Sequence, residues 1–391
     1  MEFSVPVSRI AFGGDGVGRL PDGKVCFIPG ALPGETVRAE ITHEAKSFAR
    51  AGILDVLTAS PERVEPDCPL AGTCPGCAYR HASYDCELEW KNRQFHDFLT
   101  RGNPAGKDIQ FLPPLGAPSR NGCRNKLTFV CENGAFCYRG FDNKTAVPVK
   151  DCPLGHPDIR ELLTTAEPSA DGQKRTFRRT LHDGALDSGS DAWRGITHLT
   201  EQLGPFGEFR VPKASFFQVN PEMAPKLAER VLSLLKETGS KQLLELYCGV
   251  GVFSILAAEA IPGLTAYAVE LDAAAIEAAK FNAAQHGVSD RCRFYPHDAG
   301  EIFETLVASL ESRCCVLVDP PRTGLPASLA HEIGWWAPEA ILYVSCGPDT
   351  LRRDADRLAE HGYVIQTAGM VDMFPATGHF ESVTLFRRCA S

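Results

Sequence analysis

The 391-residue sequence lacks any apolar run approaching the ~20 residues that a membrane-spanning helix needs. Its first residues are also not a basic segment followed by an apolar stretch, so no secretory signal is indicated. Internal repeats and low-complexity tracts are absent as well, which excludes repeat proteins and wholesale disorder. These absences predict a globular, cytoplasmic protein with no membrane contact.

An excess of positive charge is missing too. The formal net charge is −9 and the isoelectric point is about 5.7. A protein that coats nucleic acid by bulk electrostatics would be basic, so any polyanionic partner must bind a local patch. The length corresponds to two or three domains of about 150 residues each.

Cysteine, in contrast, is abundant. The chain has 15, an odd number, and a reducing compartment does not favour disulfides. Metal ligands, a nucleophile and small buried side chains are the better interpretation of these residues.

The sequence pattern changes twice along the chain. Residues 1–60 alternate short apolar and polar runs between Gly-rich turns, which predicts a small OB-like antiparallel β-barrel. Residues 61–215 combine close cysteines, a helical stretch at 87–99 and short strands, which predicts a central α+β domain. Residues 216–391 alternate buried strands with helices, which predicts a doubly wound, Rossmann-like α/β domain. Its expected strands are 242–246, 265–269, 315–318 and 340–344, and its expected helices include 252–260, 273–286 and 350–361.

Polar residues end successive strands of this last domain. A turn with Gly249 and Gly251 follows the first strand, and it lacks the third glycine of the dinucleotide fingerprint. Glu270 ends the next strand, where it can accept the hydroxyls of a ribose. Asp298 is placed to receive an adenine amino group, and Asp319 ends the fourth strand. This arrangement resembles class I S-adenosylmethionine-dependent methyltransferases; a nucleotide-binding dehydrogenase or a plain α/β core is the alternative.

Cys346 lies at the carboxyl end of the strand expected at 340–344, the edge where open α/β sheets bind ligands. A cysteine there can serve as a nucleophile, although packing is a common role for cysteine.

Three motifs carry a more specific resemblance. The segments VDPPRTG at 318–324, YVSCGPDTL at 343–351 and DMFPATGHFE at 372–381 are similar to those of the RNA uracil-5-methyltransferases. In that family a cysteine adds to C6 of uracil and a carboxylate removes the C5 proton. The resemblance therefore implies that Cys346 is the nucleophile and Glu381 the base. It also implies cofactor contacts from Gln218, in FFQVN at 216–220, and from Tyr247.

The chain departs from the family pattern at two positions. Val252 replaces a polar residue that often follows the second glycine, so a cofactor contact is expected to be missing there. Gly347 replaces a frequent asparagine after the nucleophile. Neither change removes a group that the reaction requires.

Cys68, Cys74 and Cys77 have C-x5-C-x2-C spacing, which indicates a metal site. Cys86 is near in sequence, whereas Cys152 shares the Cys-Pro context of the cluster. The family resemblance implies Cys152 as the fourth ligand and a [4Fe–4S] cluster; on chemistry alone, four thiolates also suit zinc.

RNA must then meet a basic patch. Residues 120–150 place Arg120, Arg124, Lys126, Arg139, Lys144 and Lys150 among Phe129, Phe136, Tyr138 and Phe141. These aromatic side chains are candidate stacking faces for single-stranded RNA. Core aromatics behind a solvated β face are the alternative. Residues 1–60 resemble the TRAM domain, which delivers RNA in modification enzymes, and no obligate protein partner is indicated.

The expected activity is therefore methyl transfer from S-adenosylmethionine to C5 of an RNA uridine that is flipped out or unpaired. Ribosomal RNA of the large subunit is the preferred substrate, and the transfer RNA T-loop is the alternative. An amino-methyltransferase for adenine or guanine, and a non-catalytic RNA-binding protein, are rival functions.

Overall fold

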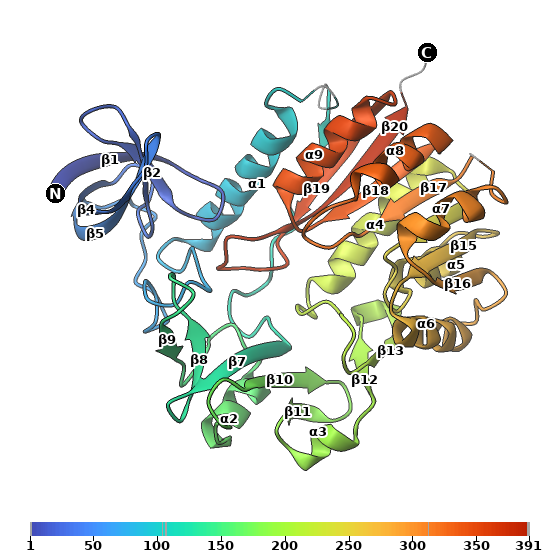
Figure 1. Cartoon of the computed structure of the whole chain (residues 1–391), viewed down its shortest axis with the longest axis horizontal. Coiled ribbons are helices and arrows are strands. Elements are labelled where there is room, and N and C mark those ends of the chain that lie inside the picture. The colour runs from blue at the N-terminus through green and yellow to red at the C-terminus, as the bar shows by residue number, and fades with distance from the viewer. Residues whose placement is uncertain (1, 104, 106–107, 312, 389–391) are drawn as a thin grey trace.

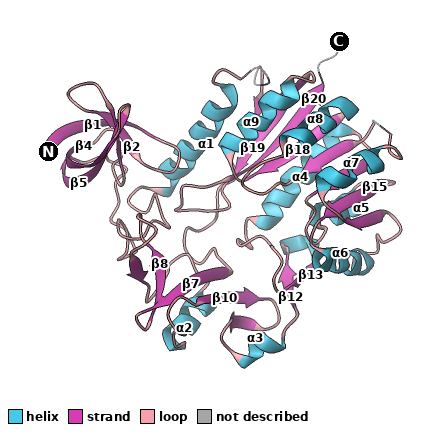
Figure 2. Cartoon of the chain, in the orientation of Figure 1, coloured by secondary structure: helices cyan, strands magenta, loops and turns pink. Residues whose placement is uncertain are grey.

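A computed structural model describes residues 2–103, 105, 108–311 and 313–388 of the chain. The chain forms, in order, a closed barrel, two small antiparallel sheets and one large mixed sheet covered by helices (Figures 1 and 2). Within these residues no helix is long and apolar enough to cross a membrane.

The barrel occupies the N-terminal segment, as predicted. Five strands close it in the order β1-β2-β3-β5-β4. Alternate side chains such as Val5, Val7, Val37 and Ala39 point inward and are buried. The strands are β1 (Glu2–Ile10), β2 (Gly16–Arg19), β3 (Val25–Ile28), β4 (Thr36–Glu44) and β5 (Phe48–Thr58).

The central part of the chain contains a five-stranded antiparallel sheet in the order β11-β10-β7-β8-β9. The aromatic side chains of Phe129, Phe136 and Phe177 form its core beside helix α2 (Pro157–Thr165). The strands are β7 (Lys126–Glu132), β8 (Ala135–Arg139), β9 (Ala146–Pro148), β10 (Lys174–Thr180) and β11 (Gly184–Asp187).

A two-stranded sheet leads from the central part toward the large sheet. The elements in this region are α3 (Asp191–Gly195), β12 (His198–Gln202), η1 (Gly204–Phe206) and β13 (Glu208–Pro212). The buried Arg178 side chain in β10 donates to Glu201 Oε1 in β12 at 2.7 Å, which joins the two small sheets.

The large sheet has the order β16-β15-β14-β17-β18-β20-β19-β6. Its first five strands are parallel to one another. Strand β20 runs antiparallel to both of its neighbours, β18 and β19. The strands are β14 (Gln242–Leu246), β15 (Thr265–Glu270), β16 (Cys292–Pro296), β17 (Cys315–Val318), β18 (Ala340–Ser345), β19 (Tyr363–Val371) and β20 (Glu381–Arg388). The expected strands and the doubly wound α/β fold are confirmed.

Helices cover both faces of this sheet because its buried strands are apolar on both sides. Leu243, Leu317 and Leu342 pack against one helical layer, and their neighbours Leu244, Val316 and Ile341 pack against the other. The first layer is α4 (Ala224–Thr238), α5 (Val252–Ala260) and α6 (Ala273–Gln285). The second layer is α7 (Ala299–Val307), α8 (Ala327–Trp336), α9 (Pro348–Ala359) and α1 (Tyr84–Thr100).

Helix α1 and the short strand β6 (Gln110–Phe111) come from the segment assigned to the central domain, yet both lie on the large sheet (Figure 1). Phe95 and Leu99 of α1 are buried in the same core as Ile365 of β19, and β6 pairs with β19. The packing of this segment is thus divided between two sheets. The predicted domain boundaries, at 1–60, 61–215 and 216–391, remain a prediction.

Candidate active site

The pairing of β18 with β20 brings Cys346 and Glu381 together. The two strands are antiparallel, and their last described pair is Ser345 with Ser382. The next residue beyond this pair is therefore Cys346 after β18 and Glu381 in β20. Both lie at the edge of the sheet where the parallel strands end, as predicted for Cys346.

The carboxyl group of Glu381 is buried, with 6% of the residue exposed. Its Oε2 atom has no hydrogen-bond partner among the described residues. Burial raises the pKa of Glu381 well above its usual value, the charge of Asp319 raises it further, and Arg322 opposes the change. Burial also raises the pKa of Asp319 to about 7.

The Cys346 thiol is partly buried in the same surroundings. Burial, followed by the charge of Glu381, raises its pKa to about 11, while Arg322 acts in the opposite direction. In the RNA-free protein the thiol is therefore mostly protonated near neutral pH. Perturbed groups gathered at a sheet edge are typical of an active site.

A cavity of about 80 Å³ lies between the end of β14 and the segment before α4, and Asp319, whose charge acts on both Glu381 and Cys346, lines it. Gln218, Tyr247 and Asp319, three of the predicted cofactor residues, line it. The Oε1 atom of Gln218 is buried, and no donor in the described chain reaches it. An unpaired buried acceptor is costly, so a ligand with a donor group would stabilise it.

The glycine turn after β14 has the backbone that only a glycine-rich segment adopts readily. Gly249 and Gly251 have φ of +53° and +82°. A Cβ atom on Gly251 would lie 2.8 Å from the Phe294 ring, so a side chain does not fit there. Tyr247 adopts φ of +66° as well, an unfavourable conformation for a non-glycine residue. Such strain is found mostly where a ligand binds.

Glu270 and Asp298 lie at the carboxyl ends of β15 and just after β16, outside the lining of this cavity. Glu270 accepts hydrogen bonds from the backbone N–H of Gly249 at 3.0 Å and of Asp272 at 2.9 Å. Asp298 is exposed and caps α7 by accepting from Gly300 N at 2.9 Å. Glu270 thus supports the turn, and Asp298 begins a helix at the same edge.

Sequence reasoning missed Glu245, which lines the same cavity from within β14. It is buried and accepts hydrogen bonds from the Ser254 backbone N–H, at 2.8 Å, and hydroxyl. Burial raises its pKa to about 8 despite these bonds. The signal was present, because a single acid inside an apolar strand is unusual.

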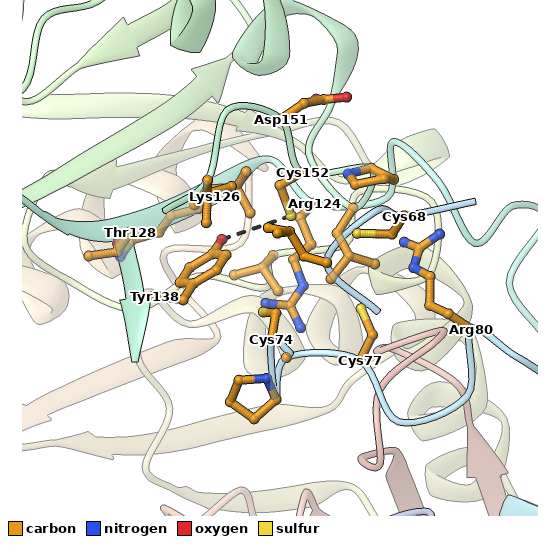
Figure 3. Close-up of a pocket in the computed structure, with 18 of the residues that line it drawn as sticks. Cys68, Cys74, Cys77, Arg80, Arg124, Lys126, Thr128, Tyr138, Asp151 and Cys152 are labelled. Atoms are coloured by element: carbon orange, nitrogen blue, oxygen red, sulfur yellow. Dashed lines mark hydrogen bonds between the residues drawn. The ribbon is translucent and has the colours of Figure 1, made fainter. Parts of the chain in front are cut away.

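The four cysteines proposed as ligands line one cavity of about 500 Å³ (Figure 3). Cys68, Cys74 and Cys77 come from the loop before α1, and Cys152 follows β9. Tyr138 also lines the cavity and donates from its hydroxyl to Cys152 Sγ at 3.9 Å. Cys86, the other possible fourth ligand, lies in α1 and does not line the cavity. Among the residues that the structure describes, no three Cys, His, Asp or Glu side chains are arranged to hold one metal ion.

The aromatic stacking surface predicted for residues 120–150 is wrong in part. Phe129 and Phe136 are buried, with ring centroids 5.8 and 5.2 Å from that of Phe177, because their strand face forms the core of the sheet. Phe141 is exposed. Of the basic residues, Arg139 pairs with Glu132 at 2.6 Å and Arg120 donates to the Tyr79 carbonyl at 2.5 Å. Lys144 and Lys150 are exposed.

The sheet order, the glycine turn and the acids at the strand ends define the class I methyltransferase fold. Comparison with known proteins narrows this class of enzymes to one family. Residues 205–389 match the family model "tRNA (Uracil-5-)-methyltransferase", and residues 2–54 match the TRAM domain.

Relatives match over nearly the whole chain. An uncharacterized RNA methyltransferase of Gloeobacter violaceus is 31% identical, covering 98% of this chain and 96% of its own. The 23S rRNA (uracil(1939)-C(5))-methyltransferase RlmD of Xanthomonas oryzae pv. oryzae is 30% identical, covering 99% and 97%. The Pyrococcus abyssi tRNA (uracil-54, C5)-methyltransferase, solved with S-adenosyl-L-homocysteine, shares the fold with a TM-score of 0.74 at 22% identity, covering 99% and 100%.

The chain therefore belongs to the RNA uracil-5-methyltransferase family. It is an S-adenosylmethionine-dependent enzyme that methylates C5 of uracil in RNA.

The raised pKa of Cys346 gives a test of the site's electrostatics. In the RNA-free protein, alkylation of Cys346 by iodoacetamide should accelerate about tenfold per pH unit from about pH 7, because only the thiolate reacts. Glu381→Gln removes a negative charge that disfavours the thiolate, so its profile should move to lower pH. Mass spectrometry of the Cys346 peptide measures the rate. A profile that levels off near the ordinary thiol pKa, or that ignores Glu381→Gln, would contradict this geometry.

Proposed function

We propose that Cys346 is the nucleophile and Glu381 the base in the methylation of an RNA uridine. The observation that carries this proposal is their juxtaposition at the end of β18 and the start of β20, where the charge of Asp319, which lines the cavity with Gln218, acts on both. A thiol and a carboxyl group that follow one another across two paired strands can act in turn on adjacent atoms of one base.

The chemistry of uracil requires both groups. C5 is a weak nucleophile, and addition of the Cys346 thiolate at C6 converts it into an enolate carbon. That carbon accepts the methyl group that S-adenosylmethionine supplies. Glu381 then removes the C5 proton, the C5=C6 bond forms again, and the C6–S electrons return to Cys346. The raised pKa of Glu381 suits this step, because its carboxylate is then a stronger base toward a proton on carbon.

Five residues are proposed to hold the cofactor: Gln218, Tyr247, Glu270, Asp298 and Asp319. The unpaired Oε1 of Gln218 fits an amino group, and the closely packed glycine turn admits a ligand against its backbone. Glu270 and Asp298, at the ends of β15 and β16, suit ribose hydroxyls and an adenine amino group, because each carboxylate oxygen can accept a further hydrogen bond beside those it makes to the backbone. Val252 lines the cavity with an apolar side chain, consistent with a missing polar contact there.

A covalent complex tests the mechanism. RNA that contains 5-fluorouridine has no C5 proton to remove, so the enzyme should remain attached to it through Cys346 and migrate as an adduct on a denaturing gel. Cys346→Ala should form no adduct and lose methylation, by at least about 10³-fold, while binding S-adenosylhomocysteine like the wild type. A wild-type enzyme that binds cofactor and methylates RNA but forms no adduct would exclude the thiolate mechanism.

We further propose that Cys68, Cys74, Cys77 and Cys152 hold a [4Fe–4S] cluster. The four thiols line one cavity of about 500 Å³, and thiolates are the ligands of both iron–sulfur clusters and structural zinc. The resemblance of the cysteine spacing to that of cluster-bearing family members is the reason for preferring the cluster. The cluster would tie the loop before α1 to the segment after β9.

The metal content distinguishes these centres. Anaerobically purified protein should contain about four irons per chain and absorb broadly in the visible range. Cys152→Ser should reduce the iron content, whereas Cys86→Ser should leave it unchanged, because Cys86 lies outside the cavity. A colourless protein with one zinc per chain would contradict the cluster.

Ribosomal RNA of the large subunit is the proposed substrate, with the transfer RNA T-loop as the alternative. The support is the match to two 23S rRNA methyltransferases, which are 30% and 29% identical over 99% of the chain. The transfer RNA enzyme is 22% identical. The family model itself is named for transfer RNA, so substrate choice depends on features outside the common catalytic fold.

Mapping of 5-methyluridine in a strain that lacks the gene should show the loss of a modified position in 23S rRNA. The level in transfer RNA should not change. Loss confined to the T-loop would assign the enzyme to transfer RNA, and restoration by wild type but not by Cys346→Ala would tie the loss to this site.

A further inference from the structure

The loop at residues 372–380 carries Glu381 into the active site. It connects β19 to β20, and Val371, the residue before it, pairs with Glu381 across the two strands. Asp372 therefore begins the loop next to the catalytic carboxyl group. The loop therefore ends directly at Glu381, the first residue of β20.

Helix α1 holds the loop through a buried ionic group. Lys91, which is fully buried, donates from Nζ to Asp372 Oδ1 at 2.9 Å and to the carbonyl of Phe374 at 3.1 Å. It also donates to Glu87 Oε1 at 2.7 Å, and that oxygen accepts from the backbone N–H of Ala376 at 2.7 Å. One lysine and one glutamate on adjacent turns of α1 thus hold the loop at three residues.

Three other parts of the chain contact the same loop. The Ala376 carbonyl accepts from the backbone N–H of Ala78 and Tyr79, which directly follow Cys77. The Asn220 side chain, two residues after Gln218, donates to the Met373 carbonyl at 3.1 Å. Gly378 lies so close to the barrel that a Cβ atom on it would be 2.7 Å from the Gly13 carbonyl oxygen.

We propose that Lys91 is a positioning residue for Glu381, with Glu87, Asp372 and Tyr84 as its partners. This proposal rests on the proposed role of Glu381 as the base. A buried ion group contributes little net stability compared with apolar packing, and its directional bonds specify one geometry. Here the bonds join α1 to Asp372, Phe374 and Ala376 in the loop that precedes Glu381. Catalytic groups must be held to within about 0.5 Å of their productive geometry.

The proposed order of steps determines which step Lys91 affects. Glu381 acts after methyl transfer, when it accepts the C5 proton and the C6–S bond to Cys346 breaks. If the loop shifts, addition and methyl transfer continue while elimination slows. The methylated, covalently bound RNA then accumulates even when the substrate contains ordinary uridine.

Lys91→Met, which keeps an unbranched side chain one atom shorter and removes the charge, is the direct test. On uridine RNA it should increase the covalent enzyme–RNA complex and lower kcat about tenfold or more, with KM for S-adenosylmethionine unchanged. Tyr84→Phe removes the hydroxyl that donates to Asp372 Oδ2 at 2.9 Å and accepts from the Ala117 backbone N–H at 2.6 Å, and it should give the same effect more weakly. Arg93→Met, on the same helix with an exposed side chain that pairs only with Glu89, is the matched control and should behave like the wild type.

Loss of activity in proportion to the folded fraction, with no covalent complex in Lys91→Met or Tyr84→Phe, would overturn the positioning role. In that case wild-type adduct formation with 5-fluorouridine RNA still supports the mechanism. Absence of that wild-type adduct would instead refute the proposed function itself, so the two failures are distinguishable.

Discussion

The reversed strand β20 is the constraint on which the site depends. In a fully parallel sheet, every strand presents its carboxyl end to the ligand edge, and the first residue of a strand lies at the opposite edge. Because β20 runs antiparallel to β18, its first residue, Glu381, lies at the ligand edge beside Cys346. The hairpin from β19 to β20 therefore supplies a second reactive group at an edge where the parallel strands already supply the cofactor turn and Asp319.

Burial gives these groups their chemical character. Glu381, Asp319 and Glu245 lie near one another with Arg322 as the cation that opposes their charge at Glu381, and burial is the main cause of each raised pKa. Acids that are hard to ionise exchange protons readily with a substrate near neutral pH. The same low polarity, followed by the charge of Glu381, disfavours the Cys346 thiolate and raises the pKa of that thiol.

The sequence predicted most of the catalytic domain, because buried parallel strands are continuous apolar runs and their ends are marked by polar residues. The strand at 340–344 and the turn at Gly249 and Gly251 were identified in this way. Glu381 could not be placed by pattern, since an acid that opens a strand looks like a surface residue, and only family motifs indicated it. Phe129 was misinterpreted because alternation does not show which face of a sheet is covered. The attachment of α1 and β6 to the large sheet was also not predictable, since it depends on contacts across more than 200 residues of sequence.

The loop before Glu381 explains why the domains are not independent attachments to a methyltransferase. It contacts the barrel at Gly13, the cysteine segment at Ala78, helix α1 at Glu87 and the cofactor segment at Asn220. The loop is thus held in place by four separate segments of the chain. Its geometry depends on the whole chain and not on the catalytic domain alone.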